Sequence, residues 1–105
     1  MKKIYFVGNT LKNPSFLIEV NTTKKIINIY KPDKYSKKEN FYEKYALGSL
    51  IINTEYDDIT FVKKPVSYKS KGLADLPVYP SLFVPEITFN INNTCLVVSK
   101  KINSD

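Results

Sequence analysis

The sequence predicts a small, mostly β domain of the α+β class, with six or seven antiparallel strands and one short helix near residues 37–47. Three observations support this fold. Short apolar runs recur along the chain and are separated by Asn, Asp, Thr or Pro. Only one segment has apolar side chains at helical spacing. The length of 105 residues fits a single domain spanning residues 1–105. The strand order is equally compatible with an OB-like barrel and with a sandwich.

The first three strands are expected before residue 32. Residues 3–7 form an apolar, β-rich run that is typical of a buried strand. Residues 15–20 and 25–31 flank a polar turn and predict a hairpin in which Val20 opposes Lys25. Because side chains alternate along a strand, one face of this hairpin is apolar and the other is mixed. The apolar face carries Phe16, Ile18, Val20, Ile27 and Ile29, and the mixed face carries Leu17, Glu19, Ile26, Asn28 and Tyr30.

A single helix is predicted over residues 37–47. Ser36 and Glu39 fit a capping box, in which the Ser36 hydroxyl accepts from the Glu39 N–H and the Glu39 side chain reaches back. Gly48 suits the position just after the last turn, where a left-handed residue ends many helices. The apolar residues at helical spacing are Phe41, Tyr42, Tyr45 and Ala46.

Two more hairpins are predicted in the second half of the chain. Residues 49–53 and 58–64 flank a polar turn, and a short strand is expected at residues 66–69. The last hairpin joins residues 87–91 to residues 94–99 through Asn92-Asn93, because Asn tolerates the positive φ of a type I′ turn. Its apolar side carries Ile87, Phe89, Ile91, Thr94, Leu96 and Val98, and its other side carries Thr88, Asn90, Cys95 and Val97.

The composition argues against catalysis. The chain has no His, Arg, Trp or Gln, and its only Cys is Cys95, which is expected to be a packed apolar residue. Without His there is no ordinary base to activate a Ser or Cys nucleophile, and a zinc site lacks its usual ligands. The acidic residues Glu55, Asp57 and Asp58 lack an EF-hand pattern, so a solvated turn is expected there. We therefore expect no enzyme activity, no metal site and no cofactor.

The N-terminal segment and the composition suggest a cytoplasmic protein. Residues 1–8 begin like a signal peptide, but the apolar run is much shorter than such a peptide requires. No stretch reaches the length of a membrane span, and a lone Cys fits a reducing compartment. No membrane partner is expected. The abundance of Lys, Asn, Ile, Tyr and Phe reflects A/T-rich codons, which points to a low-GC bacterium, its phage or its plasmid.

The positive charge is concentrated near the N-terminus. The net charge is +6, and residues 1–44 hold ten lysines and four acidic residues, whereas residues 45–105 hold six of each. Lysines between residues 24 and 45 alternate with aromatic residues, a composition suited to neutralising phosphates and stacking on bases. Without Arg and Gln, which usually read the bases, a nucleic acid would be recognised mainly through contacts with its phosphate backbone and by base stacking, with weak sequence preference. The predicted nucleic-acid-binding residues are Lys24, Lys25, Lys31, Lys34, Tyr35, Lys37 and Lys38.

A second candidate surface lies at residues 73–85. This segment is apolar, nearly uncharged and stiffened by Pro77, Pro80 and Pro85, so it is expected to be an edge or a wrapped loop and not a central strand. It could present a preorganised protein-binding surface or close the end of the core. The residues that would contact a protein partner are Leu73, Leu76, Val78, Tyr79, Leu82 and Phe83.

Two functions follow from these surfaces. The first is a small basic non-enzymatic accessory factor that binds nucleic acid. The alternative is a protein-interaction module, either an inhibitor of a host or defence protein or a small part of a larger assembly. The basic surface also has a plainer interpretation, because the aromatic residues of the predicted helix could face the core and the lysines could be solvated. Protein binding would be indicated by an exposed apolar patch or an unpaired strand edge.

Overall fold

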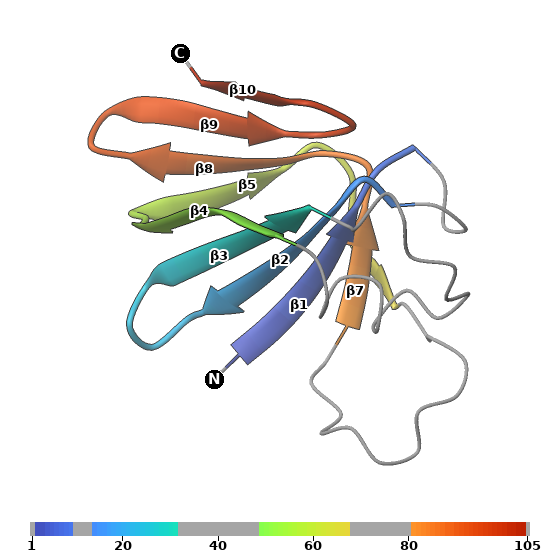
Figure 1. Ribbon diagram of the computed structural model, residues 1–105, viewed down its shortest axis with the longest axis horizontal. Coiled ribbons are helices and arrows are strands. Elements are labelled where there is room, and N and C mark those ends of the chain that lie inside the picture. The colour runs from blue at the N-terminus through green and yellow to red at the C-terminus, as the bar shows by residue number, and fades with distance from the viewer. Residues whose placement is uncertain (1, 10–13, 32–48, 68–80, 105) are drawn as a thin grey trace.

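The computed structural model describes residues 2–9, 14–31, 49–67 and 81–104, and these residues form two β-sheets (Figure 1). The larger sheet has six strands in the order β4-β3-β2-β1-β7-β6, and the smaller has four in the order β10-β9-β8-β5. The strands are β1 (Lys2–Val7), β2 (Phe16–Asn21), β3 (Ile26–Lys31), β4 (Ser49–Glu55), β5 (Asp58–Phe61), β6 (Val66–Ser67), β7 (Ser81–Val84), β8 (Ile87–Ile91), β9 (Thr94–Val98) and β10 (Ile102–Ser104).

The described part of the chain is all-β. It contains no helix, and hence none with the length and hydropathy needed to cross a membrane. The predicted helix at residues 37–47 lies outside the described residues. The described strands form two separate sheets and no closed barrel, so the OB-like barrel is not the architecture of this part of the chain.

One face of each sheet contributes to a common core. The six-stranded sheet supplies residues such as Ile18 and Ile29, and the four-stranded sheet supplies Ile87 and Phe89, all fully buried. The opposite face of the six-stranded sheet has a second, smaller apolar cluster, with the half-buried Tyr30 packed against it. That second cluster consists of Ile4, Phe6, Leu17 and Phe83.

β1 is a central strand, buried over most of its length as predicted. It pairs with β2 in the antiparallel direction and with β7 in the parallel direction. The expectation of only antiparallel strands was therefore wrong for this pair. The expectation that residues 73–85 contain no central strand was also wrong for β7, which lies between β1 and β6. Pro80 and Pro85 flank β7 without entering it, so every residue of the strand retains its N–H donor.

The hairpin of β2 and β3 has the predicted faces and a shifted register. Val20 opposes Ile27, not Lys25, so the four-residue loop spans residues 22–25 and not residues 21–24. A shift of two residues leaves each side chain on its own face, and all five predicted apolar residues lie in the core. Lys25 adopts a positive φ of 53°, and the Asn21 side chain accepts hydrogen bonds from the Thr23 and Lys24 N–H groups. These local bonds favour the observed position of the turn, one residue later than predicted.

The predicted hairpin of residues 49–53 and 58–64 was wrong. β4 pairs with β3 and β5 pairs with β8, so the chain passes from one sheet to the other between them. The Tyr56 N–H donates to the Lys25 carbonyl in the β2–β3 turn at 3.0 Å, and the Asp57 N–H donates to the Asn90 carbonyl in β8 at 2.7 Å. The Tyr56 ring is buried and meets Phe89 edge-on, with centroids 5.8 Å apart. Burial of this ring anchors the crossing in the core.

The last hairpin is confirmed in register and in turn type. Ile91 opposes Thr94, and Asn92 and Asn93 have φ angles of 49° and 66°, as a type I′ turn requires. Four of the six residues predicted for its apolar side are buried in the core. Ile91 is half-buried against the core, and Thr94 is exposed, so the prediction was wrong for Thr94. Cys95 is half-buried on the other side, where its thiol lies 3.9 Å from the Asn90 side-chain oxygen.

Candidate functional site

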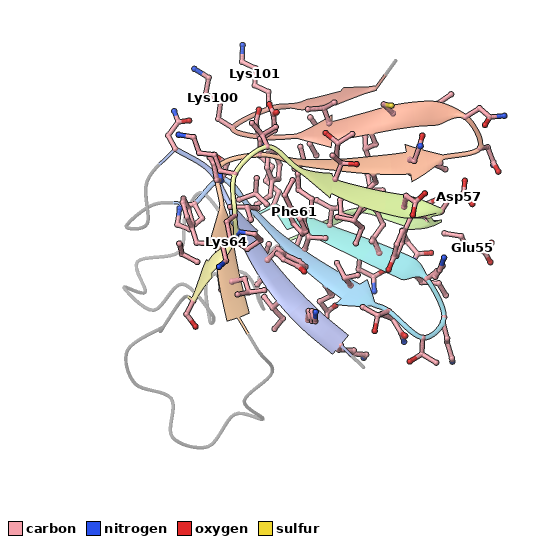
Figure 2. The ribbon with its side chains drawn as sticks, turned by 180° about the vertical axis from the view of Figure 1, so that it is seen from behind. Glu55, Asp57, Phe61, Lys64, Lys100 and Lys101 are labelled. Atoms are coloured by element: carbon pink, nitrogen blue, oxygen red, sulfur yellow. The ribbon has the colours of Figure 1, made fainter. Side chains whose placement is uncertain are left out.

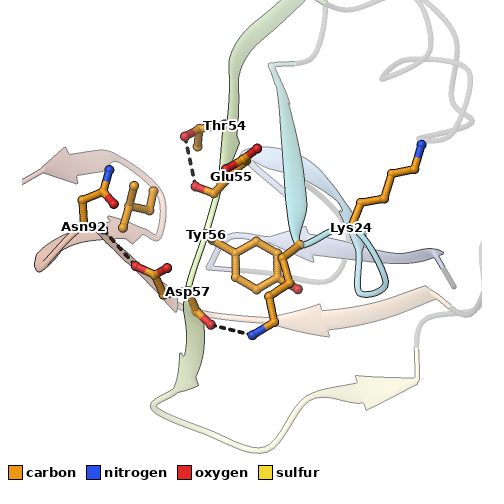
Figure 3. Close-up of a pocket in the computed structure, with 8 residues that line it drawn as sticks. Lys24, Thr54, Glu55, Tyr56, Asp57 and Asn92 are labelled. Carbon is orange, nitrogen blue, oxygen red and sulfur yellow. Dashed lines mark hydrogen bonds between the residues drawn. The ribbon is translucent and has the colours of Figure 1, made fainter.

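Three surface features of the described residues are candidates for function: a polar corner, a lysine-rich end and an unpaired strand edge. The polar corner lies where the turn after β2, the crossing from β4 to β5 and the turn after β8 meet (Figure 3). It is an open cavity of about 480 Å³. The residues that line it are Lys24, Lys25, Thr54, Glu55, Tyr56, Asp57, Ile91 and Asn92.

Hydrogen bonds of the fold already occupy much of the polar corner. The Asn92 N–H donates to the Asp57 carboxylate at 3.0 Å, and the Lys25 ammonium donates to the Asp57 carbonyl at 3.3 Å (Figure 3). Asp57 therefore joins the β8–β9 turn and the β2–β3 turn to the crossing between the sheets. These contacts explain Asp57 as a structural residue, although it lies in a crossing between sheets and not in the hairpin turn that was expected.

The ionisable groups in and near the corner include two buried tyrosines, Tyr56, which lines it, and Tyr5. Among the described residues, no three potential ligands gather to hold a metal ion. Burial raises the pKa of Tyr56 above 10.0. Burial, and secondarily the charge of Tyr56, raises the pKa of Tyr5 in the same way. Both phenols therefore remain neutral near pH 7, and neither acts as a base there. Opposite charges share the corner, since Lys24 and Glu55 both line it.

The predicted nucleic-acid-binding residues do not converge within the described chain. Lys24 and Lys25 lie in the turn before β3, whereas Lys31 is the last residue of that strand. Six residues of extended chain separate Lys25 from Lys31, a distance of about 20 Å. Tyr30 is half-buried on the outer face of β3, where burial, followed by a hydrogen bond to Glu19, raises its pKa to about 12. Lys34, Tyr35, Lys37 and Lys38 lie outside the described residues.

The predicted protein-binding residues fall partly in the core and partly outside the described chain. Phe83 of β7 is only 8% exposed and belongs to the second apolar cluster. Leu82 is half-buried and packs against the main core. Leu82 and Phe83 therefore stabilise the fold through apolar packing. The remaining predicted residues, Leu73, Leu76, Val78 and Tyr79, lie outside the described residues.

The lysine-rich end was missed by the sequence analysis. It consists of Lys63, Lys64, Lys100 and Lys101, which follow β5 or connect β9 to β10. Figure 2 shows Lys64, Lys100 and Lys101 at one end of the molecule, and Glu55 and Asp57 at the other. The available signal was the pair of Lys-Lys doublets. The zero net charge of residues 45–105 concealed it, because that sum includes Glu55, Asp57 and Asp58, which lie at the crossing between the sheets.

The unpaired edge of β4 was also missed. β4 is the outermost strand of its sheet and has no strand on its far side among the described residues. Two large apolar side chains are exposed there, Leu50 at 51% and Ile51 at 42%. The available signal was an apolar segment with no Lys or Pro to protect it. The sequence did not show that β4 would lie at an edge, because the predicted hairpin gave it the wrong partner.

No protein-family model, curated protein or solved structure matches this chain.

Proposed function

We propose that this protein is a non-enzymatic binding domain whose partner is a protein that adds an extended segment to β4. The observation that carries the proposal is the unprotected edge of this strand. A free strand edge presents unpaired N–H and C=O groups, which an extended peptide can satisfy by continuing the sheet. The absence of His and Arg from the chain supports a binding role in place of a catalytic one.

Comparison of the four outermost strands favours β4. β6 has two residues and directly follows Lys63, Lys64 and Pro65, so it is short and flanked by protective residues. β10 has three residues, and β5 has four with Asp58 at its start. β4 has seven residues, with no Lys or Pro and a single charged residue, Glu55, at its end. Among the described edges, β4 is the longest and the least protected.

The hydrogen-bond pattern identifies which groups of β4 are free. The Tyr56 N–H donates to the Lys25 carbonyl, so it points toward β3. N–H groups alternate in direction along a strand, and the register is regular from Ile52 to Glu55. The Thr54 N–H therefore also faces β3, whereas the N–H groups of Asn53 and Glu55 face away from it. A partner strand would bond to the backbone of these last two residues.

A β-bulge marks one end of the free edge. Ile29 opposes Ile52 and Tyr30 opposes Leu50, so Ile51 has no counterpart on β3. A bulge bends the strand and interrupts regular pairing, so the added segment would pair mainly with residues 52–55. The exposed Leu50 and Ile51 side chains would then supply apolar contact beside the paired segment.

Selection from a displayed library of random decapeptides, followed by NMR mapping, tests this proposal. Selected peptides should slow hydrogen exchange at the Asn53 and Glu55 N–H groups and leave that of Thr54 unchanged. Asn53→Pro, which removes an outward donor, should weaken binding at least tenfold. Asn53→Ala is the matched control, because it removes the Asn side chain but keeps the backbone N–H. It should bind nearly as well as the wild type.

A second pair of variants tests the apolar contact. Leu50→Ser with Ile51→Ser should weaken peptide binding, whereas Val62→Ser with Val66→Ser should not. Val62 and Val66 are exposed to 65% and 50%, so both variants remove two exposed apolar side chains. Failure to select any peptide, or exchange protection that maps away from β4, would refute the proposal.

Nucleic-acid binding is the second candidate function. The net charge of +6 supports it, as does the gathering of four lysines at one end of the four-stranded sheet. Phosphate contacts by lysine are electrostatic and independent of sequence. The partner would then be recognised through its backbone, as the composition predicts.

A further inference from the structure

We infer that the lysine-rich end, and not the turn holding Lys24 and Lys25, is the phosphate-binding surface of this protein. The inference rests on the second proposed function, nucleic-acid binding, and assigns it to one place. The ligand class is the phosphate backbone of a nucleic acid, contacted by Lys63, Lys64, Lys100 and Lys101.

The sheet register places the two lysine doublets on the same end of the molecule. Phe61 opposes Ile87, Ile87 opposes Val98, and Val98 opposes Ile102, so these four residues form one row across the smaller sheet. Lys63 and Lys64 follow the first residue of this row, and Lys100 and Lys101 precede the last one. Three inter-strand spacings separate the two sides of the row, about 14 Å in total. Two pairs of cations at this separation can contact different phosphates of one ligand.

The four ammonium groups are free to bind an anion. Within the described residues, no hydrogen bond or ion pair occupies the side chain of Lys63, Lys64, Lys100 or Lys101. The contrast is Lys25, whose ammonium donates to the Asp57 carbonyl at 3.3 Å. A phosphate at the lysine-rich end would therefore displace only water. A phosphate at Lys25 would have to replace the hydrogen bond between the Lys25 ammonium and the Asp57 carbonyl.

The charge distribution also favours this end. The described acidic residue that the register places at this end is Glu86, which directly precedes Ile87, so four lysines there face one carboxylate. Glu55, Asp57 and Asp58 lie at the crossing between the sheets, and Figure 2 shows the first two at the opposite end. Like charges on one surface raise the local concentration of counter-ions. The turn holding Lys24 and Lys25 instead shares its cavity with Glu55 and Asp57.

Hydrogen bonds fix the turn that presents Lys100 and Lys101. The Ser99 N–H donates to the Lys101 carbonyl at 2.9 Å, and the Lys101 N–H donates to the Ser99 hydroxyl at 3.5 Å. A turn that is already ordered loses less conformational entropy when it binds. The two lysines therefore project from a fixed backbone.

The described surroundings predict recognition without base stacking. The nearest aromatic residue, Phe61, is half-buried and packs on Tyr5 with ring centroids 5.5 Å apart, so its face is not free. Binding should therefore depend on phosphate contacts alone. Four such contacts to duplex DNA predict a slope of about −3.6 in a plot of log K against log salt.

Fluorescence anisotropy across a salt series tests the assignment, with labelled duplex and single-stranded oligonucleotides of mixed sequence. Lys63→Gln with Lys64→Gln, and separately Lys100→Gln with Lys101→Gln, should each reduce the duplex slope by about 2. Lys24→Gln with Lys25→Gln is the matched control, because it removes the same net charge at the other end. This control should leave the slope nearly unchanged, and circular dichroism should show that all three variants are folded.

The outcomes separate the site from the function. Absence of binding even at low salt would overturn nucleic-acid binding and the site together. Equal losses in all three double variants, or a loss confined to Lys24 and Lys25, would leave nucleic-acid binding intact and overturn the site. Vesicles of phosphatidylserine and phosphatidylcholine provide the remaining comparison. Vesicle binding that persists at salt concentrations that release DNA would overturn nucleic acid as the occupant.

Discussion

At the scale of single residues, hydrogen bonds and burial explain the roles of Asp57 and Tyr56, which the composition does not reveal. Asp57 is a member of an acidic cluster in the sequence, and in the fold its carboxylate accepts a hydrogen bond from the Asn92 N–H. Tyr56 is one aromatic residue among several, and in the fold its ring closes the core at the crossing between sheets. Both roles depend on a partner at least thirty residues away, so no local pattern reveals them.

Tyr30 provides a test at this scale through the pH dependence of stability. Burial and the hydrogen bond to Glu19 raise its pKa from 10.0 to about 12, which favours the protonated phenol in the folded state. Its contribution is therefore complete below pH 10 and is lost as the pH rises toward 12. We expect the urea midpoint to fall over this range, and to fall less steeply in Tyr30→Phe. Difference titration of tyrosinate absorbance between the two proteins should show one group ionising near pH 12, and ionisation of that group near pH 10 would contradict the assignment.

At the scale of elements, strands whose partners are adjacent in the sequence were predicted best. The register and the turn of the β8–β9 hairpin were predicted correctly because Asn92 and Asn93 determine the turn locally. The β2–β3 hairpin kept its faces when its register shifted by two residues, because side chains alternate with a period of two. The β4–β5 pairing was wrong, because the choice between a neighbouring and a distant partner depends on where Tyr56 is buried.

The β8–β9 turn provides the second test. Asn93 has a φ of 66°, in the left-handed region that a residue with a side chain occupies at a cost. Asn93→Ala should lower the free energy of unfolding by about 1 kcal/mol, because Ala lacks the local hydrogen bonds that help Asn adopt this conformation. Asn93→Gly should equal or exceed the wild type in stability, because glycine adopts this φ freely. Urea denaturation of both variants measures the difference, and equal stabilities would show that the turn does not require a positive φ.

At the scale of the whole molecule, the two sheets should unfold as one unit because they share a core. Ile18 in the larger sheet and Ile87 in the smaller are both fully buried in the same cluster. Ile18→Val and Ile87→Val each remove one methylene from this core and should each lower the free energy of unfolding by about 1 kcal/mol. Circular dichroism and tyrosine fluorescence should report one coincident transition in each variant. A variant that splits the transition in two would show that the sheets are stabilised independently.

The two proposed partners also belong to this scale, because each depends on how the sheets are assembled. The order of strands in the larger sheet leaves β4 at an edge. The register of the smaller sheet places two lysine doublets, separated by about forty residues of chain, on one end. Neither surface was a prediction of the sequence, and the surfaces that were predicted lie largely outside the described residues or, for Leu82 and Phe83, in the core.

The sequence by itself determined which segments become strands in most of the described chain and which side chains of the β2–β3 hairpin, and most of those of the β8–β9 hairpin, face the core. These properties follow from side-chain alternation, turn residues and composition, which are local. Only the tertiary structure decided that β7 lies parallel to β1, that β4 and β5 enter different sheets, and which lysines share a surface. Those properties depend on contacts between distant residues. Each strand packs where its apolar face can be buried against the others, and no single segment specifies that arrangement.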